Sequence, residues 1–255
     1  MATLAPAQSK LAPDTKFFLT MAIVFAAINV AAFSFFALMG ISSFGAPLYV
    51  HVHAFTFFGW VVIYVTQNAL VATGSTALHR KLGWFAAAYT IFMVIVGTLT
   101  TVHNVQRGMV PPLFEPAHFL IMNPLNVFCF AMLVLAGVAV RANTGWHRRL
   151  IYCGMASIMG PAFGRLLPPP LQLSGGMTLI FGILAGFMLI GVVRDRITHG
   201  RIHPAWWVGL SVLTMQWLVG EPIARTSFGL SLYQGVVDGT AGAAKPPYEK
   251  APFPG

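Results

Sequence analysis

The sequence predicts an all-α protein built as a polytopic bundle of about seven transmembrane helices. Hydrophobic residues make up 57% of the chain and charged residues only 8%. The mean hydropathy of +0.75 is far above the usual range of soluble domains. Apolar runs recur at about the length that crosses a bilayer. Basic residues gather in alternate connections between these runs, as they do in multi-pass membrane proteins.

Seven apolar runs are expected to form the spans, and the fifth and sixth are short. They cover residues 17–39, 48–71, 82–102, 119–140, 150–166, 177–193 and 205–219. They place one membrane domain over 17–225, between an N-terminal extension (1–16) and a C-terminal tail (226–255). Because the extension is polar and lacks the cleavage pattern of a signal peptide, the first span is expected to be retained.

The distribution of basic residues predicts the orientation in the membrane. Ten lie on the side of the N-terminus: Lys10, Lys16, Arg80, Lys81, Arg141, Arg148, Arg149, Arg194, Arg196 and Arg201. Five lie on the other side: Arg107, Arg165, Arg225, Lys245 and Lys250. We therefore expect a multi-pass protein of a bacterial inner (cytoplasmic) membrane, with a cytoplasmic N-terminus and the C-terminus outside. Attraction to anionic lipid heads accounts for the net charge of +9, and no nucleic-acid partner is expected.

Two further features concern partners and redox state. The tail ends in a Pro-rich sequence, KPPYEKAPFPG, which is typical of an extended segment. Such a tail is either disordered or docks on a partner, for example another membrane subunit. Cys129 and Cys153 both lie inside predicted spans, so they are interpreted as small apolar fillers and not as a disulfide framework.

One face of the second span is predicted to point into the bundle. Residues at three- and four-residue steps share this face: His53, Phe57, Trp60, Tyr64 and Gln67. Imidazole and amide groups at depth are costly to expose to lipid, so the face should look inward. His118 opens a comparable face of the fourth span. His53 and His118 at similar depth would suit axial ligation of haem b, with Trp60, Tyr64 and Gln67 lining the cofactor cleft.

A metal ion is the alternative to haem at the outer membrane face. The residues expected there as ligands are His51, His53, His103, His118 and Glu115. His51 and His53 lie on opposite sides of their helix, so only one is expected to point inward, and His53 is favoured. A simpler interpretation is that these side chains prefer the headgroup zone and form hydrogen bonds there.

At the inner face, His79 and His147 each precede an arginine. The two imidazoles are candidates for a second haem pair, with the adjacent arginines binding the propionates. The same His-Arg turns are also typical anchors to lipid phosphates. Asp195 is expected to pair with Arg80 or Arg148 in a network that holds helices together.

Three segments carry a resemblance to known families. Residues 78–84 (LHRKLGW), 146–150 (WHRRL) and 200–204 (GRIHP) resemble an uncharacterised family of bacterial polytopic membrane proteins with His-Arg turns. The histidines that open successive helices are also similar to the layout of cytochrome b561-type proteins. That resemblance implies two haems, held by His53 with His118 and by His79 with His147. The chain departs from that family in having seven predicted spans where the family has six.

Three hypotheses of function follow. The first is a haem b-binding membrane protein that passes electrons from a quinol or another small reductant to an acceptor. The second is a non-catalytic accessory subunit of a larger membrane complex, binding lipid or quinone. The third is a metal-dependent membrane enzyme at the outer face. It ranks last because the sequence lacks the clustered HxxxH or HxxHH patterns of di-iron hydroxylases and desaturases and has no HExxH motif.

Overall fold

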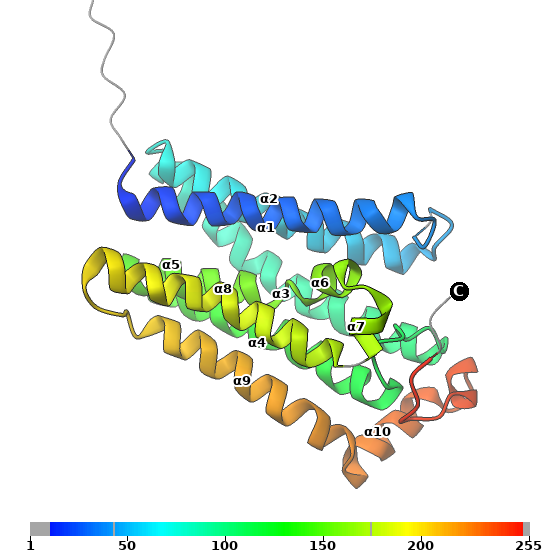
Figure 1. Cartoon of the computed structure of the whole chain (residues 1–255). Helices are drawn as coiled ribbons and strands as arrows, with labels where there is room; N and C mark the ends of the chain where they lie inside the picture. The colour runs from blue at the N-terminus through cyan, green and yellow to red at the C-terminus, as the bar shows by residue number, and fades with distance from the viewer. Residues whose placement is uncertain (1–10, 43, 174, 252–255) are drawn as a thin grey trace, which may run out of the picture.

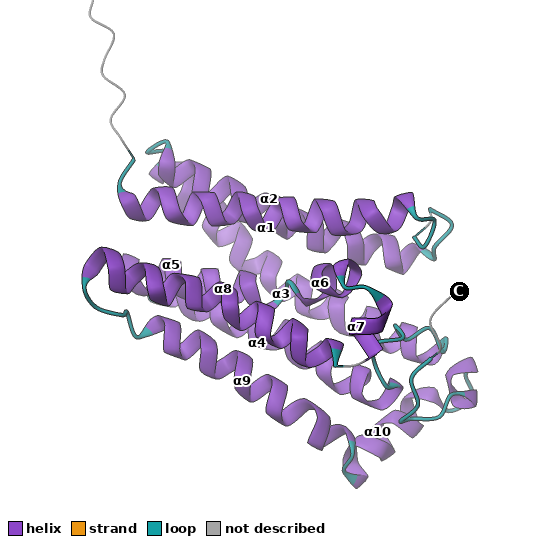
Figure 2. Cartoon of the chain, in the orientation of Figure 1, coloured by secondary structure: helices purple, strands orange, loops and turns teal. Residues whose placement is uncertain are grey.

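The structure is a computed structural model that describes residues 11–42, 44–173 and 175–251. Every regular element in these residues is helical (Figure 2). The long helices are α1 (Pro13–Leu38), α2 (Leu48–Ala72), α3 (Thr76–Gln106), α4 (Pro116–Ala139), α8 (Gly176–His199) and α9 (Ala205–Ala224). The shorter ones are α5 (Thr144–Ser157), α6 (Gly160–Leu166), α7 (Pro169–Leu173), α10 (Ser227–Val237) and the 3-10 helix η1 (Ala241–Ala244).

The helices run roughly alongside one another in a bundle (Figure 1). Helix α4 packs against α3, α5 and α9, whereas α1 closes the other side by packing against α2 and α6. The turns that follow α2, α4 and α8 lie with the start of α1 at one end, called the basic end below (left in Figure 1). Helices α6, α7 and α10 lie toward the opposite end, called the α10 end.

The prediction of an all-α protein is confirmed for the described residues, and several of the predicted spans are long apolar helices. Five helices are long and apolar enough to cross a membrane, namely α1, α2, α3, α4 and α8. The predicted seventh span corresponds to α9, which has 20 residues and is not among these five. The predicted fifth span, 150–166, is not one helix, because α5 and α6 divide it after Ser157.

The break between α5 and α6 has a local cause in the sequence. Pro161 follows Ser157 by four residues and has no backbone N–H to donate to the Ser157 carbonyl. The side chain of Asn126 on α4 donates to that carbonyl instead, at 3.1 Å. An unpaired carbonyl inside an apolar bundle is costly. The Asn126 amide therefore allows the helix to break within the bundle.

The C-terminal tail differs from the extended segment that its composition predicts. Thr226 caps α10 by accepting from the backbone N–H of Gly229 at 3.1 Å. Tyr233 on α10 is 3% exposed and donates to the Lys245 carbonyl at 2.8 Å. Beyond η1, the Pro247 carbonyl accepts from the backbone N–H of Ala117 at 2.9 Å. The described part of the tail thus packs on the chain's own helices. Its apolar residues form one face of a helix, which the Pro-rich ending of the sequence does not indicate.

Candidate functional site

One face of α2 lines the bundle interior over most of its length, as the polar and aromatic stripe predicts. Trp60 and Tyr64 are 2% and 3% exposed. Trp60 packs edge-on against Phe130 of α4, with ring centroids 5.1 Å apart. His53 begins this face near the α10 end, and Gln67 ends it at the basic end, where its amide reaches His79. The stripe therefore connects the two sets of histidines that the sequence singled out.

His79 and His147 come together at the basic end. Their ring centroids are 6.1 Å apart, and the ring planes are nearly perpendicular, at 88°. His79 lies in the first turn of α3 and His147 in the first turn of α5. Since the two helices are separated by the whole of α4, only the folded bundle brings these rings together.

Each ring of this pair is held through its Nδ1 atom. His147 Nδ1 lies 2.8 Å from the carbonyl oxygen of Gly137 on α4. The Gln67 amide, oriented so that its oxygen accepts from the Gly83 N–H at 2.8 Å, reaches His79 Nδ1 at 2.6 Å. In this orientation Nδ1 accepts, so the proton of the neutral ring is on Nε2. In the opposite orientation the amide oxygen accepts from Nδ1–H, which leaves Nε2 unprotonated but turns the amide N–H₂ toward the Gly83 N–H. The Nε2 atom of each ring is thus left for another partner.

The contact between α4 and α5 depends on a glycine. A Cβ added at Gly137 would lie 2.8 Å from Ile151 Cγ1 and 3.2 Å from the His147 carbonyl oxygen. Real Cβ atoms do not approach so closely, so a side chain at 137 would push the two helices apart. Gly137 thereby supplies both the space for His147 and the carbonyl that orients its ring.

Buried ion pairs hold the helices around this pair. Asp195 on α8 accepts from Arg149 Nε and Nη2, both at 2.7 Å, and from Trp206 Nε1 at 2.8 Å. Asp195 and Arg149 are 1% and 3% exposed. The predicted partners of Asp195, Arg80 and Arg148, are therefore wrong. Fully buried carboxylates need several donors, and the fork of Arg149 points inward whereas Arg80 is exposed.

A second acidic residue joins this end. Asp14 on α1 forms ion pairs with Arg148 of α5 and Arg194 of α8, and lies 3.3 Å from His199 Nε2. The start of α1 is thereby attached to two later helices. Arginines that composition alone assigns to lipid anchoring thus hold the helix ends together here.

The residues expected to ligate a metal at the other face do not form one group. No cluster of three or more His, Cys, Asp or Glu side chains with metal-binding geometry is found in the described residues. Glu115 instead pairs with Arg225, whose Nη2 donates to both carboxylate oxygens at 2.9 and 3.0 Å. His51 Nε2 lies 3.1 Å from the Phe44 carbonyl, and His103 Nδ1 lies 2.8 Å from the Leu99 carbonyl.

His53 and His118 have separate surroundings. His53 stacks on Phe57, with ring centroids 4.3 Å apart, and its Nδ1 is buried without a partner. The His118 ring lies near Phe114, at 6.1 Å, and its Nε2 would be 3.8 Å from a Cβ at Gly220 of α9. In the described residues, the two histidines whose rings contact each other are His79 and His147.

Sequence reasoning did not single out Arg165 of α6 as a site residue. Arg165 is the only charged residue of the predicted span 150–166. Its guanidinium carbon lies 4.1 Å from the ring centre of Phe33 on α1. A lone charge inside an apolar run often marks a functional residue in membrane proteins. That feature of the sequence could have identified Arg165 as a candidate site residue.

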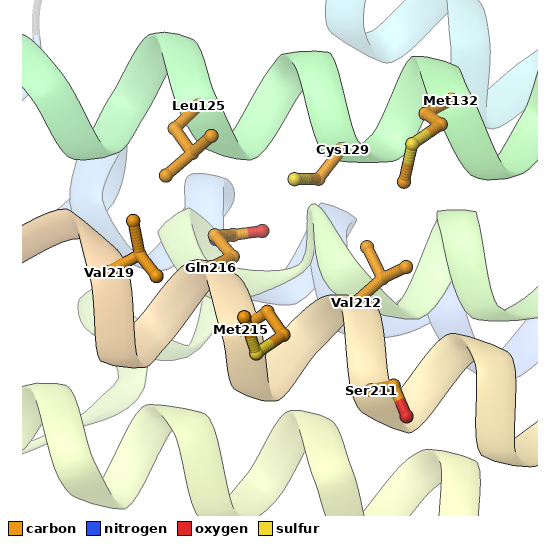
Figure 3. A pocket seen from close by; sticks show the side chains of 8 residues that line it. All are labelled: Leu125, Cys129, Met132, Ser211, Val212, Met215, Gln216 and Val219. Carbon is orange, nitrogen blue, oxygen red and sulfur yellow. The ribbon is translucent and has the colours of Figure 1, made fainter.

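A shallow apolar groove of about 270 Å³ lies between α4 and α9 (Figure 3). Its wall includes Leu125, Cys129, Met132, Ser211, Val212, Met215, Gln216 and Val219. Gln216 is 4% exposed and its Oε1 atom is buried without a partner. The groove thus combines a hydrocarbon surface with one unsatisfied acceptor.

Comparisons with protein-family models, with curated proteins and with solved structures gave no match for this chain.

Proposed function

We propose that the protein is a haem b-binding membrane protein that transfers electrons, and that His79 and His147 would hold the haem iron. The observation that carries this proposal is the pairing of the two rings. Metal–imidazole bonds are about 2.0–2.1 Å long, and two rings whose centroids lie 6.1 Å apart are close enough to bind one metal together.

The surroundings of the pair fit this role. A carbonyl that accepts from Nδ1–H fixes the ring and makes Nε2 a better ligand, and Gly137 provides such a carbonyl for His147. Two arginines near the histidines in the sequence are the candidates to bind the haem propionates. Arg80 follows His79 directly, and Arg141 precedes His147 by six residues.

Haem iron, when bound, supplies reversible one-electron transfer in a site whose polarity and hydrogen bonds set its potential. The residues of this chain would orient the ligands and keep the interior dry. Trp60 and Tyr64 do so along α2, where they fill the space between the two ends. A quinol or another small reductant is the proposed electron donor.

The charge distribution supports a location in a bacterial inner membrane with the basic end in the cytoplasm. In that orientation the His79–His147 pair lies at the cytoplasmic side and His53 at the outer side. The pair implied by the family resemblance at the outer side, His53 with His118, is a weaker candidate because the two rings do not contact one another.

An absorption spectrum tests the proposal. Protein purified in mild detergent after expression with a haem precursor should show split α and β bands once reduced with dithionite. His79→Ala and His147→Ala should each remove these bands, whereas His103→Ala should retain them. If circular dichroism shows that the wild-type protein is folded and the protein is colourless, the haem proposal is wrong.

A second candidate function is a non-catalytic subunit that binds lipid or quinone within a larger membrane complex. The groove between α4 and α9 favours it, because Gln216 provides a buried acceptor in an apolar wall. Co-purification of a partner in fixed stoichiometry, lost with Gln216→Leu, would support this function. A monodisperse monomer with bound haem would contradict it.

A further inference from the structure

The guanidinium of Arg165 has few of the partners that a buried cation requires. Its Nη1 donates to the Pro161 carbonyl at 2.9 Å, but its Nε is buried without an acceptor. Two aromatic rings of α1 flank it, Phe33 at 4.1 Å and Phe36 at 5.3 Å. Within residues 11–42, 44–173 and 175–251, no carboxylate lies at ion-pair distance from this guanidinium.

This arrangement leaves a positive charge without a counter-charge. Arginine stays protonated in proteins, and a cation in an apolar environment is costly unless it is paired. At this end of the bundle, Glu115 and Glu221 contact Arg225, and Asp238 and Glu249 form no ion pair with Arg165 in the described residues. The described part of the chain therefore leaves this charge to an anion that a ligand supplies.

A second unpartnered polar atom lies on the neighbouring helix α2, where His53 Nδ1 is buried without a partner. Phe33, which lies under the Arg165 guanidinium, also packs against Phe58 of α2, with ring centroids 5.1 Å apart. One side of the His53 ring is covered by Phe57, with centroids 4.3 Å apart. Helices α1, α2 and α6 thus contribute two cationic or donor groups surrounded by aromatic surface.

We infer that Arg165 and His53 bind a carboxylate carried on an apolar body, such as an aromatic acid or a fatty-acid anion. The guanidinium fork presents two parallel N–H groups that match a carboxylate. The imidazole adds a third donor. The rings of Phe33, Phe36 and Phe57 provide apolar contact for the body of the ligand. One guanidinium balances one negative charge, which favours a monocarboxylate over a phosphate dianion.

The inference stands apart from the haem proposal, because it is argued from residues at the other end of the bundle. Its test uses the full chain in an uncharged detergent at pH 7.5. Binding of benzoate and of decanoate is measured by calorimetry, together with the shift in melting temperature. Benzoate represents a soluble source of the carboxylate and decanoate a source in the membrane. Benzamide and decanol are the matched neutral probes.

We expect benzoate or decanoate to bind and to raise the melting temperature, whereas the neutral probes do not. Arg165→Gln should weaken binding at least tenfold, and His53→Leu should weaken it less. Arg107→Gln is the matched control, since it removes the same charge from an exposed side chain after α3 and should bind as the wild type does.

Several outcomes would overturn the inference. In the wild-type protein, equal responses to decanoate and decanol would show that only the apolar chain is recognised, and this comparison needs no variant. Binding that survives Arg165→Gln would place the anion elsewhere. Preference for phosphatidylglycerol over both carboxylates would identify the site as a lipid-headgroup site and contradict the carboxylate assignment.

Discussion

Two arginines that enter the bundle from successive helices, Arg149 and Arg165, have opposite surroundings. Arg149 donates twice to Asp195 at 2.7 Å and once to the Gly145 carbonyl at 3.0 Å. Arg165 donates to one carbonyl and otherwise rests on aromatic rings. The first satisfies its charge within the chain, and the second does not.

The difference shows how the same side chain serves two purposes in an apolar bundle. A buried arginine with a complete set of acceptors holds helices α5, α8 and α9 together, because removing any partner leaves a charge behind. An arginine without a carboxylate partner contributes little to folding and is available to a ligand. Stability and binding are therefore expected to separate between the two ends of the molecule.

The largest expected effect comes from breaking the satisfied pair. Asp195→Asn leaves Arg149 charged and buried, which typically costs about 3–5 kcal/mol in the free energy of unfolding. The melting temperature in detergent should fall sharply. Arg201→Met, which changes an exposed arginine of the same end, is the control and should leave it nearly unchanged.

The double variant Arg149→Met with Asp195→Leu sharpens this test. Replacing both members by apolar groups of similar size removes the unpaired charge, so stability should return toward that of the wild type. A double variant as unstable as Asp195→Asn alone would mean that packing around Trp206, and not charge, holds this end.

A smaller loss is expected at the helix break that positions Arg165. Asn126→Leu removes the donor to the Ser157 carbonyl, and a buried carbonyl without a partner costs about 1–3 kcal/mol. The melting temperature should fall by less than in Asp195→Asn. Asn104→Leu, which removes an acceptor for Tyr49 at the α10 end, serves as a comparison, and an equal or larger loss there would contradict a special role for Asn126.

Arg165→Met addresses the unsatisfied arginine directly. Without a ligand, the variant should be as stable as the wild type or slightly more stable, because it removes a charge that has no counter-charge. The measurement is the melting temperature of the purified protein in detergent, after bound organic acids have been removed. A loss as large as that of Asp195→Asn would show that Arg165 has a structural role like that of Arg149.

The smallest expected effect concerns pH at the basic end. Burial and the nearby charge of Arg149 lower the pKa of His203 in the folded state. The unfolded chain, with a histidine pKa of about 6.5, then binds the proton first. Stability contributed by neutral His203 is present above about pH 6.5 and is lost as the pH falls through the lowered pKa.

His203→Asn tests that dependence. The Asn side chain retains an acceptor for the Ala205 N–H, which lies 3.2 Å from His203 Nδ1, but it does not titrate. Its melting temperature should therefore decline less than that of the wild type between pH 7 and 5. Parallel curves for the two proteins would assign the acid sensitivity to other groups.

Much of the fold follows from patterns within single segments. Apolar runs and basic turns predict the all-α bundle and the start of most helices, because each span must satisfy its backbone internally. The break after Ser157 is not predicted from the apolar run, although Pro161 is a signal of it. The run does not show that a side chain, that of Asn126, can donate to the Ser157 carbonyl in place of a backbone N–H. Helix α10 is not predicted either, because the Pro-rich ending indicates an extended tail.

The candidate site was predicted only in part. The sequence indicated that His79 and His147 lie at one membrane face, and that one face of α2 points inward. Periodicity along a helix determines which residues share a face but not which faces meet. The partner of Asp195 and the separation of His53 from His118 depend on how helices are rotated and tilted against one another.

Local hydrophobicity and residue spacing are enough to predict an all-α protein with long apolar helices and one end rich in positive charge. The folded bundle was needed to show that Arg149 is neutralised whereas Arg165 is not, and that two imidazoles lie 6.1 Å apart. Those outcomes depend on close contacts between distant segments, such as the approach of α5 to Gly137, that no single segment encodes.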